Sequence, residues 1–194
     1  MLHAVTGPEI TVATPEDRGS VVTSLVAAFT KDPVLRHLFP DEATYARYAA
    51  AFFGHLFDKR VHKETIWTIG HGASVAIWEP PASGSAQPDD DLAARLPADV
   101  LHRVRAYDEA VHAALPAAPF WYLGVLGTHP DHAGRRWGHA VMRMGLDRAA
   151  ADGLPAILET SNPDNVEVYR RAGWEVVHAF AEPLPTWVMR NRRT

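Results

Sequence analysis

The sequence predicts an α/β or α+β sandwich built on a mixed sheet, and three observations indicate this class. The chain has 194 residues, of which 47% are hydrophobic and 22% charged, and this suits a single compact domain over residues 1–194. In the first half, Gly70-His71-Gly72 separates two β-rich runs, which is a strong hairpin signal. In the second half, strand-like and helix-like segments alternate, an order that favours strands joined by crossover helices.

The first half is predicted to hold a short strand, two helices and the hairpin. The strand covers Ile10 to Ala13, and Thr14-Pro15 then supplies an N-cap and a proline at the first helical position. Apolar residues at a 3.6-residue spacing continue this helix until Asp32-Pro33 ends it. A second helix is expected from about Glu42 to His62. Its expected inward-facing residues are Tyr45, Tyr48, Phe52 and Leu56, with Phe53 and Phe57 as further candidates. The hairpin strands are Thr65–Ile69 and Ala73–Trp78.

The second half begins after a loop from Pro80 to Asp91, which is rich in Pro, Gly, Ser and Asp. Gly153 is suited to follow a helix end, and Asn162-Pro163 to begin the next helix with a side-chain cap. The elements expected here are a helix over 98–115, a strand over 119–127, a helix over 136–151, a strand over 156–160, a helix ending at Gly173, and strands over 174–179 and 186–190. The last two are expected to pair antiparallel.

Composition excludes several classes of function. The formal net charge is −4 and the pI is near 6.2, which argues against nucleic acid or an anionic membrane surface as the main partner. There is no cysteine, so disulfides, thiol nucleophiles and thiolate metal sites are excluded. No apolar stretch is long enough to span a bilayer, and Met1 to Ile10 lacks the apolar core of a signal peptide. We therefore expect a cytoplasmic protein without a membrane partner.

The stretch Val125–His139 is the most informative segment. A strand is followed by a loop that contains Gly134 and Gly138, and the loop passes directly into a helical pattern. This order exposes free backbone N–H groups at the positive end of a helix dipole, an arrangement that binds phosphates. Arg135 and Arg136 add positive charges that can pair with phosphate oxygens. The three-glycine spacing of a dinucleotide-binding loop and the Lys-Ser/Thr ending of a kinase-type loop are both missing.

A second segment, Leu158 to Trp174, narrows the class of protein that the first segment indicates. It has an asparagine that opens a helix (Asn162), a tyrosine seven residues later (Tyr169) and a closing Gly173-Trp174. Together the two segments resemble the GNAT superfamily of N-acetyltransferases, whose acetyl-CoA loop, Gln/Arg-x-x-Gly-x-Gly/Ala, falls on Ala133 to Gly138. The pattern departs at Ala133 and at Arg136, which replaces the central glycine. An arginine at a helix N-terminus can adopt helical angles without strain, so the N–H groups need not be lost.

The likeness extends over most of the chain and is strongest to puromycin N-acetyltransferase-like members. The residues that carry this closer resemblance are Asp32-Pro33, Trp78-Glu79-Pro80, Leu158-Glu159-Thr160 and Thr186-Trp187. The resemblance implies a mixed, mostly antiparallel sheet of about seven strands. It also implies helices on both faces and a splay between the two central parallel strands.

The resemblance further implies acetyl-CoA as co-substrate and CoA as product. The pantetheine amides would pair with the backbone of Leu126, Gly127 and Thr128 like an added strand. The pyrophosphate would meet the loop and helix start. The residues implied there are Gly134, Arg135, Arg136, Trp137, Gly138 and His139. Asn162 or Asn165 would bond the pantetheine arm, and no metal is implied.

Tyr169 is the candidate general acid, because a phenol of pKa about 10 stays protonated at neutral pH and can share its proton with a departing thiolate. Glu159 is the first candidate for the base that receives the proton of the attacking amine, and Asp32 and Glu79 are weaker ones. Asp32, Trp78 and Tyr122 are the candidates for contact with the acceptor.

The function expected from these residues is transfer of an acetyl group to a primary amine of a small molecule by direct attack in a ternary complex. Two alternatives stay open at this point. One is acetylation of a protein or peptide amine. The other is a degenerate domain that binds acyl-CoA as a non-catalytic sensor, which Ala133 and Arg136 favour. A monomer and a homodimer are both compatible with the sequence.

Overall fold

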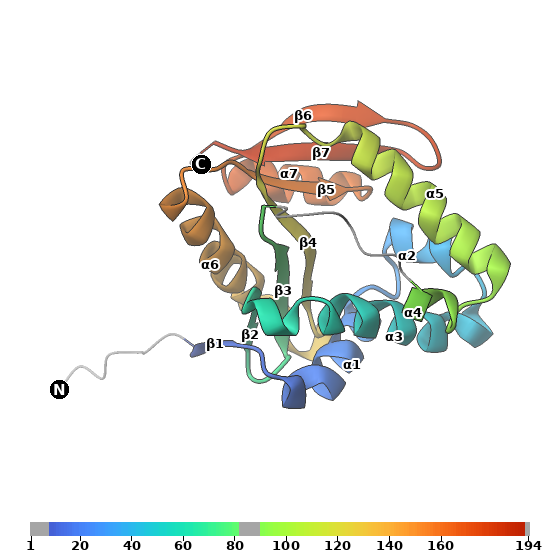
Figure 1. The fold of residues 1–194 in the computed structure, drawn as a ribbon. Helices are drawn as coiled ribbons and strands as arrows, with labels where there is room; N and C mark the ends of the chain where they lie inside the picture. The colour runs from blue at the N-terminus through green and yellow to red at the C-terminus, as the bar shows by residue number, and fades with distance from the viewer. Residues whose placement is uncertain (1–7, 82–89, 193–194) are drawn as a thin grey trace.

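The computed structural model describes residues 8–81 and 90–192, and there it forms a seven-stranded sheet covered by helices on both faces (Figure 1). The strands are β1 (Ile10–Val12), β2 (Ile66–Ile69), β3 (Ser74–Glu79), β4 (Trp121–Thr128), β5 (Ala156–Thr160), β6 (Trp174–Phe180) and β7 (Thr186–Asn191). The helices are α1 (Arg18–Ala28), α2 (Pro33–Leu38), α3 (Glu42–Asp58), α4 (Asp90–Ala93), α5 (Ala98–Ala114), α6 (Trp137–Ala151) and α7 (Pro163–Arg171). The expected fold class is confirmed.

The sheet has the order β1-β2-β3-β4-β5-β7-β6, and only β4 and β5 pair in parallel. Their pairing is short, running from Trp121 opposite Ala156 to Leu123 opposite Leu158. Beyond that point the strands separate: β4 continues to Thr128 bonded only to β3, and β5 continues bonded only to β7. In Figure 1, β5, β6 and β7 run across the top of the view while β3 and β4 run downward from them. This is the expected splay.

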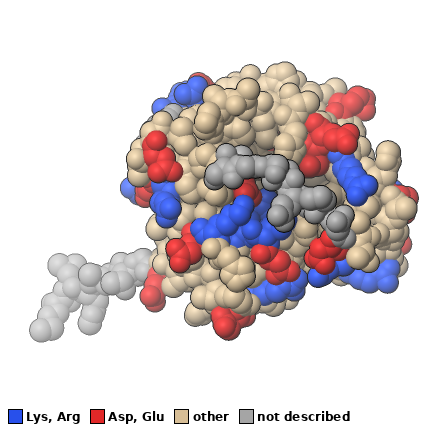
Figure 2. Space-filling view, in the orientation of Figure 1, with Lys and Arg blue, Asp and Glu red and all other residues tan. Residues whose placement is uncertain are grey.

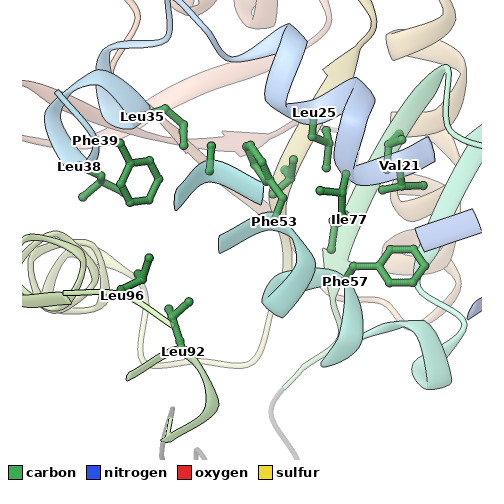
Figure 3. Packing of buried hydrophobic residues seen from close by; sticks show 14 of the residues in the cluster. Val21, Leu25, Leu35, Leu38, Phe39, Phe53, Phe57, Ile77, Leu92 and Leu96 are labelled. Carbon is green, nitrogen blue, oxygen red and sulfur yellow. The ribbon is translucent and has the colours of Figure 1, made fainter. Parts of the chain in front are cut away.

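Each face of the sheet has its own apolar core. Helices α1, α2, α3, α4 and α5 pack on one face, where Phe53 and Phe57 meet Ile77 of β3 (Figure 3). Helices α6 and α7 pack on the other face, against Trp78, Leu158 and neighbouring strand residues. Because both faces are covered, β2 and β3 are buried along nearly their whole length rather than on alternate residues.

Side-chain caps explain where several helices begin. Asp32 accepts hydrogen bonds from the backbone N–H groups of Val34 (2.9 Å) and Leu35 (3.1 Å), and Asp41 accepts one from Ala43 (2.9 Å). These bonds satisfy amide groups that have no partner within the helix. Asn162 caps α7 in the same way, as the Asn162-Pro163 pair predicted.

Two expectations for the first half were wrong. Asp32-Pro33 does not simply end a helix, because Asp32 is the N-cap of α2 and Pro33 is its first residue. Asn162-Pro163 begins α7 in the same way, with a capping side chain followed by a proline at the first helical position. The inward face of α3 was wrong in part: Tyr45, Phe53 and Phe57 are buried, as expected or allowed for, whereas Tyr48, Phe52 and Leu56 lie at the edge of the core.

Other boundaries differ by a few residues. The helix expected to reach His62 ends at Asp58, and a short 3-10 helix covers Val61–Lys63. The loop expected over Pro80 to Asp91 lies largely outside the described residues, and α4 begins at Asp90. The remaining strands and helices lie close to their expected ranges.

Acidic and basic side chains are interspersed over the face of the molecule seen in Figure 2, in keeping with the small net charge. Several of them pair with each other, such as Arg18 with Asp58 at 2.8 Å. In the part of the chain that the structure describes, no helix is both long and apolar enough to cross a membrane.

The contact between α6 and the sheet yields a test of the packing. A Cβ atom on Gly145 would lie 2.1–2.4 Å from atoms of the fully buried Trp78 indole, which has no room to move. We expect Gly145→Ala to lower the free energy of unfolding by about 1–3 kcal/mol, because overpacking outweighs the gain in helix propensity. Gly19→Ala is the control, since it meets no atom within 4 Å and should be neutral or stabilising. Urea denaturation of both variants measures this, and an unchanged Gly145→Ala midpoint would contradict the packing described.

Candidate functional site

A cavity of about 220 Å³ opens where β4 and β5 part. Its walls come from the end of β4, the first turn of α6 and the outer face of α7. The residues that line it are Leu126, Gly127, Thr128, Gly138, His139, Met142, Asn165, Val168 and Tyr169. The structure therefore brings residues of both sequence segments to one place.

The backbone around this cavity has free hydrogen-bonding groups. After Leu123, the edge of β4 that faces β5 has no strand partner, so it can accept an extended ligand as an added strand. At the start of α6, the first intrahelical bond runs from the Ala140 N–H to the Arg136 carbonyl. The N–H groups of Trp137, Gly138 and His139 thus point out of the helix N-terminus, where the helix dipole favours an anion.

The loop before α6 holds two residues in the left-handed region. Gly134 has a φ of +78°, and Arg136, the N-cap of α6, has φ +60° and ψ +18°. The expectation that Arg136 would adopt helical angles without strain is therefore wrong. The loop keeps a backbone conformation that suits glycine, at a cost of about 1–2 kcal/mol for a residue with a side chain. The amide groups that follow Arg136 stay exposed.

Aromatic contacts brace this loop from the outside. His132 stacks on Trp137 with ring centroids 5.0 Å apart, and the Arg135 guanidinium lies 5.0 Å from the centroid of the same indole. His129 meets His132 edge-on at 6.2 Å. These contacts tie the first residue of α6 to the turn after β4, and they leave the guanidinium of Arg135 at the surface.

Helix α7 supplies the other wall. The side chain of Asn162 caps the helix by accepting from the Asp164 N–H at 3.0 Å, whereas Asn165, the other residue expected to bond the pantetheine arm, lines the cavity. Tyr169 lies one turn further along the same face and packs edge-on against Trp174. Burial raises the pKa of the Tyr169 phenol above its ordinary value, and the charge of Glu159 raises it further. The phenol therefore stays protonated throughout the neutral range.

Glu159 lies half-buried on β5, where the Tyr122 hydroxyl donates a hydrogen bond to its Oε2 across the splay. Burial raises the pKa of the Glu159 carboxyl from 4.5 to about 7, and the bond from Tyr122 acts in the opposite direction. A carboxyl with this pKa is divided between its acid and its base at neutral pH. Tyr122, expected to contact the acceptor, holds the candidate base.

Asp32 reaches the same region from the N-terminus of α2. Burial raises the pKa of its carboxyl, and the hydrogen bonds from the Leu35 and Val34 N–H groups lower it. The charge of Asp32 raises the pKa of Glu159 and of Tyr169, so its carboxylate lies in the neighbourhood of both groups.

Two other expected residues do not reach this neighbourhood. Trp78, expected to contact the acceptor, is 0% exposed and packs under α6 against Gly145, so it belongs to the core. Glu79, a weaker candidate for the base, is held by Arg60 and Lys63 in two ion pairs. An ionised carboxylate with two cationic partners is a poor proton acceptor.

The sequence analysis did not identify two residues that line the cavity, Met142 and Val168. It also did not identify the packing constraint on Gly127. Met142 follows Gly138 by one turn of α6, and Val168 follows Asn165 by three residues, so helical spacing from the expected residues could have found both. Val168 is an apolar side chain that is 45% exposed at the cavity. Gly127 is needed for packing as well, because a Cβ there would lie 2.7 Å from Leu25 of α1.

Solved structures share this architecture along nearly the whole chain. "Histone acetyltransferase HPA2 and related acetyltransferase" from Corynebacterium glutamicum matches with 20% identity, 96% coverage of both chains and a TM-score of 0.65. Arylalkylamine N-acetyltransferase 2 from Aedes aegypti matches with 8% identity, 97% and 100% coverage, and a TM-score of 0.67. An agmatine N-acetyltransferase matches with 15% identity, 95% and 100% coverage, and a TM-score of 0.62. The fold is that of the GNAT N-acetyltransferases.

The sequence itself supports the same class. Residues 103–174, from α5 to the start of β6, match the sequence model of the Acetyltransferase (GNAT) family. This range contains the loop before α6, Glu159 and Tyr169. The match covers less than half of the chain, so it shows that this region is similar to the acetyltransferases of that family.

The left-handed Arg136 yields a second test. Replacing it by glycine removes the steric cost of the positive φ, while glycine adds conformational entropy to the unfolded chain. We expect Arg136→Gly to raise the free energy of unfolding by about 0.5–1 kcal/mol. Arg135→Gly is the matched control and should be destabilising, because Arg135 does not have a positive φ and loses its contact with Trp137. Chemical denaturation compares the pair, and equal effects would contradict the loop conformation.

Proposed function

We propose that this protein is an N-acetyltransferase that moves the acetyl group of acetyl-CoA to a primary amine of a small molecule by direct attack in a ternary complex. The observation that carries the proposal is the cavity between β4 and β5, which Tyr169 and the free N–H groups at the start of α6 line, with Glu159 on the adjoining strand β5. The names of the similar structures include acetyltransferases of arylalkylamines and of agmatine, which are amines. The whole chain is proposed to act as one catalytic domain.

The residues present fit acetyl-CoA. The N–H groups of Trp137, Gly138 and His139, with Arg135 and Arg136 beside them, match a pyrophosphate. The unpaired edge of β4 from Leu126 to Thr128 matches the amides of the pantetheine arm, and Asn165 and Val168 offer it one polar and one apolar contact. When bound there, acetyl-CoA supplies a thioester carbonyl that an amine can attack.

The chain's own contribution to the reaction is the handling of two protons. Glu159 takes the proton of the incoming ammonium, because its raised pKa leaves it basic enough while still partly ionised at neutral pH. Tyr122 keeps the carboxyl oriented through its hydrogen bond. As the C–S bond breaks, Tyr169 donates its hydroxyl proton to the departing sulfur, and the nitrogen of the new amide loses its second proton, which restores the phenol.

The proposal is tested by acetyl-CoA binding followed by thiol release over a panel of acceptors. We expect acetyl-CoA to raise the melting temperature and a small amine to release thiol. The absence of a thermal shift would contradict the cofactor assignment. A shift without thiol release on any acceptor would indicate a sensor, and release only with lysine-containing or N-terminal peptides would indicate a protein acetyltransferase.

The raised pKa of Glu159 predicts a pH dependence. A base is active when deprotonated, so kcat/KM should fall about tenfold per pH unit below the pKa of about 7 and level off above it. Glu159→Gln should remove this limb and most of the activity. Tyr122→Phe removes a bond that lowers the pKa, so its limb should move to higher pH. Steady-state rates from pH 5.5 to 9 are measured for the unsubstituted protein and for both variants. A limb that shifts to lower pH in Tyr122→Phe would contradict the assignment of Glu159 as the base.

The role of Tyr169 predicts a separation of rate from binding. Tyr169→Phe keeps the ring that packs on Trp174 but removes the proton donor. We expect kcat to fall about a hundredfold while the Kd of acetyl-CoA changes by less than about threefold. Calorimetry measures the Kd of acetyl-CoA, and initial rates measure kcat. Unchanged turnover would remove Tyr169 from the mechanism.

A further inference from the structure

The acceptor side of the site contains two acidic groups on different elements. Asp32 comes from the N-terminus of α2 and Glu159 from β5, and each acts on the hydroxyl groups of Tyr107 and Tyr169. Asp108, on α5, adds a further negative charge that acts on Glu159. Asp32, Glu159 and the two tyrosines therefore lie in one neighbourhood beside the splay, whereas Asp108 lies at the surface.

Asp32 and Glu159 lack a cationic partner in the part of the chain that the structure describes, whereas Asp108 pairs with His112. Asp32 accepts only from the Val34 and Leu35 N–H groups, and Glu159 only from the Tyr122 hydroxyl; neither forms an ion pair with a lysine, arginine or histidine of the described residues. The nearby Arg36 donates to the Pro40 carbonyl and lies over the Tyr45 ring instead. Buried carboxylates without cations are unfavourable until a cation reaches them.

Tyr107 provides an independent sign of a ligand in the same place. Its side chain lies on α5 and is 8% exposed, and its hydroxyl is buried without a hydrogen-bond partner. The neighbouring hydroxyls of Ser161 and Thr186 bond to each other at 2.7 Å, although both are close enough to affect its pKa. A buried hydroxyl without a partner is rare in a folded protein. Its lone pairs, set among carboxylates, are suited to accept from an N–H donor.

We propose that the acceptor carries a second positive charge, so that the site takes diamines and related dications, with Asp32 and the Tyr107 hydroxyl binding the second cationic group while Glu159 faces the reacting nitrogen. This inference rests on the proposed function. Glu159 becomes neutral once it has taken a proton, so it cannot anchor a cation through the reaction. Asp32 takes no part in that proton transfer and can do so. An acceptor with a carboxylate tail would meet only repulsion here.

Binding to the CoA-saturated protein tests this without turnover. The probes are 1,4-diaminobutane, butylamine and 4-aminobutanoate, with the three- to six-carbon diamines to allow for length, all titrated by calorimetry at pH 8. We expect the best diamine to bind at least about tenfold more tightly than butylamine, and 4-aminobutanoate to bind most weakly. Equal affinities would overturn the inference. So would a preference for 4-aminobutanoate, which would direct the tail to Lys31 and Arg36 in the neighbouring cavity of about 480 Å³.

Three variants distinguish a loss of charge recognition from a loss of folding stability. Asp32→Asn keeps an N-cap acceptor for α2 but removes the charge, so the ratio of diamine to butylamine affinity should fall to near one. Asp41→Asn makes the same change at the exposed cap of α3 and should leave the ratio unchanged. Tyr107→Phe should weaken the diamine at least about threefold with an equal or higher melting temperature, because it removes a buried group without a partner. A ratio retained in Asp32→Asn, or diamine affinity retained in Tyr107→Phe, would overturn the role of that residue.

Thiol release from acetyl-CoA then distinguishes the two proposals. A protein that binds diamines selectively but releases no thiol would support this inference and contradict the proposed catalysis. A protein that acetylates butylamine and diamines with equal kcat/KM would support the catalysis and overturn the second charge.

Discussion

The parting of β4 and β5 after three residue pairs is the constraint on which the site depends. Main-chain polar groups at a strand edge need partners, and β4 remains ordered past the split only because β3 continues to bond its other edge. A single residue, Gly124, bulges out of the β3 register just beyond Leu123, where such an irregularity increases the local twist. The helices that follow the two strands then begin on either side of the opening. One of them presents free N–H groups and the other presents Tyr169.

The same opening determines the chemistry of Glu159. A carboxyl at the end of an exposed strand would keep an ordinary pKa, but here the tyrosines of β4, α5 and α7 and the N-terminus of α2 surround it. The native state consequently holds a proton on Glu159 between pH 4.5 and about 7, where the unfolded chain does not. Its contribution to stability is most favourable below that window and declines as pH rises through it. The fold thus becomes less stable as the base becomes active.

Local patterns were sufficient to predict most elements and most of the residues that line the cavity between β4 and α7. Helix starts with a capping residue and a proline, and the Asn162–Tyr169 spacing, are encoded within a few residues. The acceptor side was not predictable in this way. Trp78 and Tyr122 lie on neighbouring strands and look equivalent in sequence, yet α6 covers the first and the splay exposes the second. Tyr107 has no motif, and only the packing of α5 beside β6 brings it into the neighbourhood of Glu159.

In the loop before α6, the same arginine residues destabilise the free loop and favour the binding of an anion. Arg136 occupies a conformation that is unfavourable for its side chain, and both arginines place positive charge at the positive end of a helix dipole. Neither feature helps the free protein. A doubly charged anion on the exposed N–H groups would turn the charge repulsion into attraction, and the contacts among His132, Trp137 and Arg135 hold the loop in place until it arrives. Arginine at the glycine position therefore exchanges stability of the free loop for charge at the proposed phosphate site, and strained residues characteristically occur at functional sites.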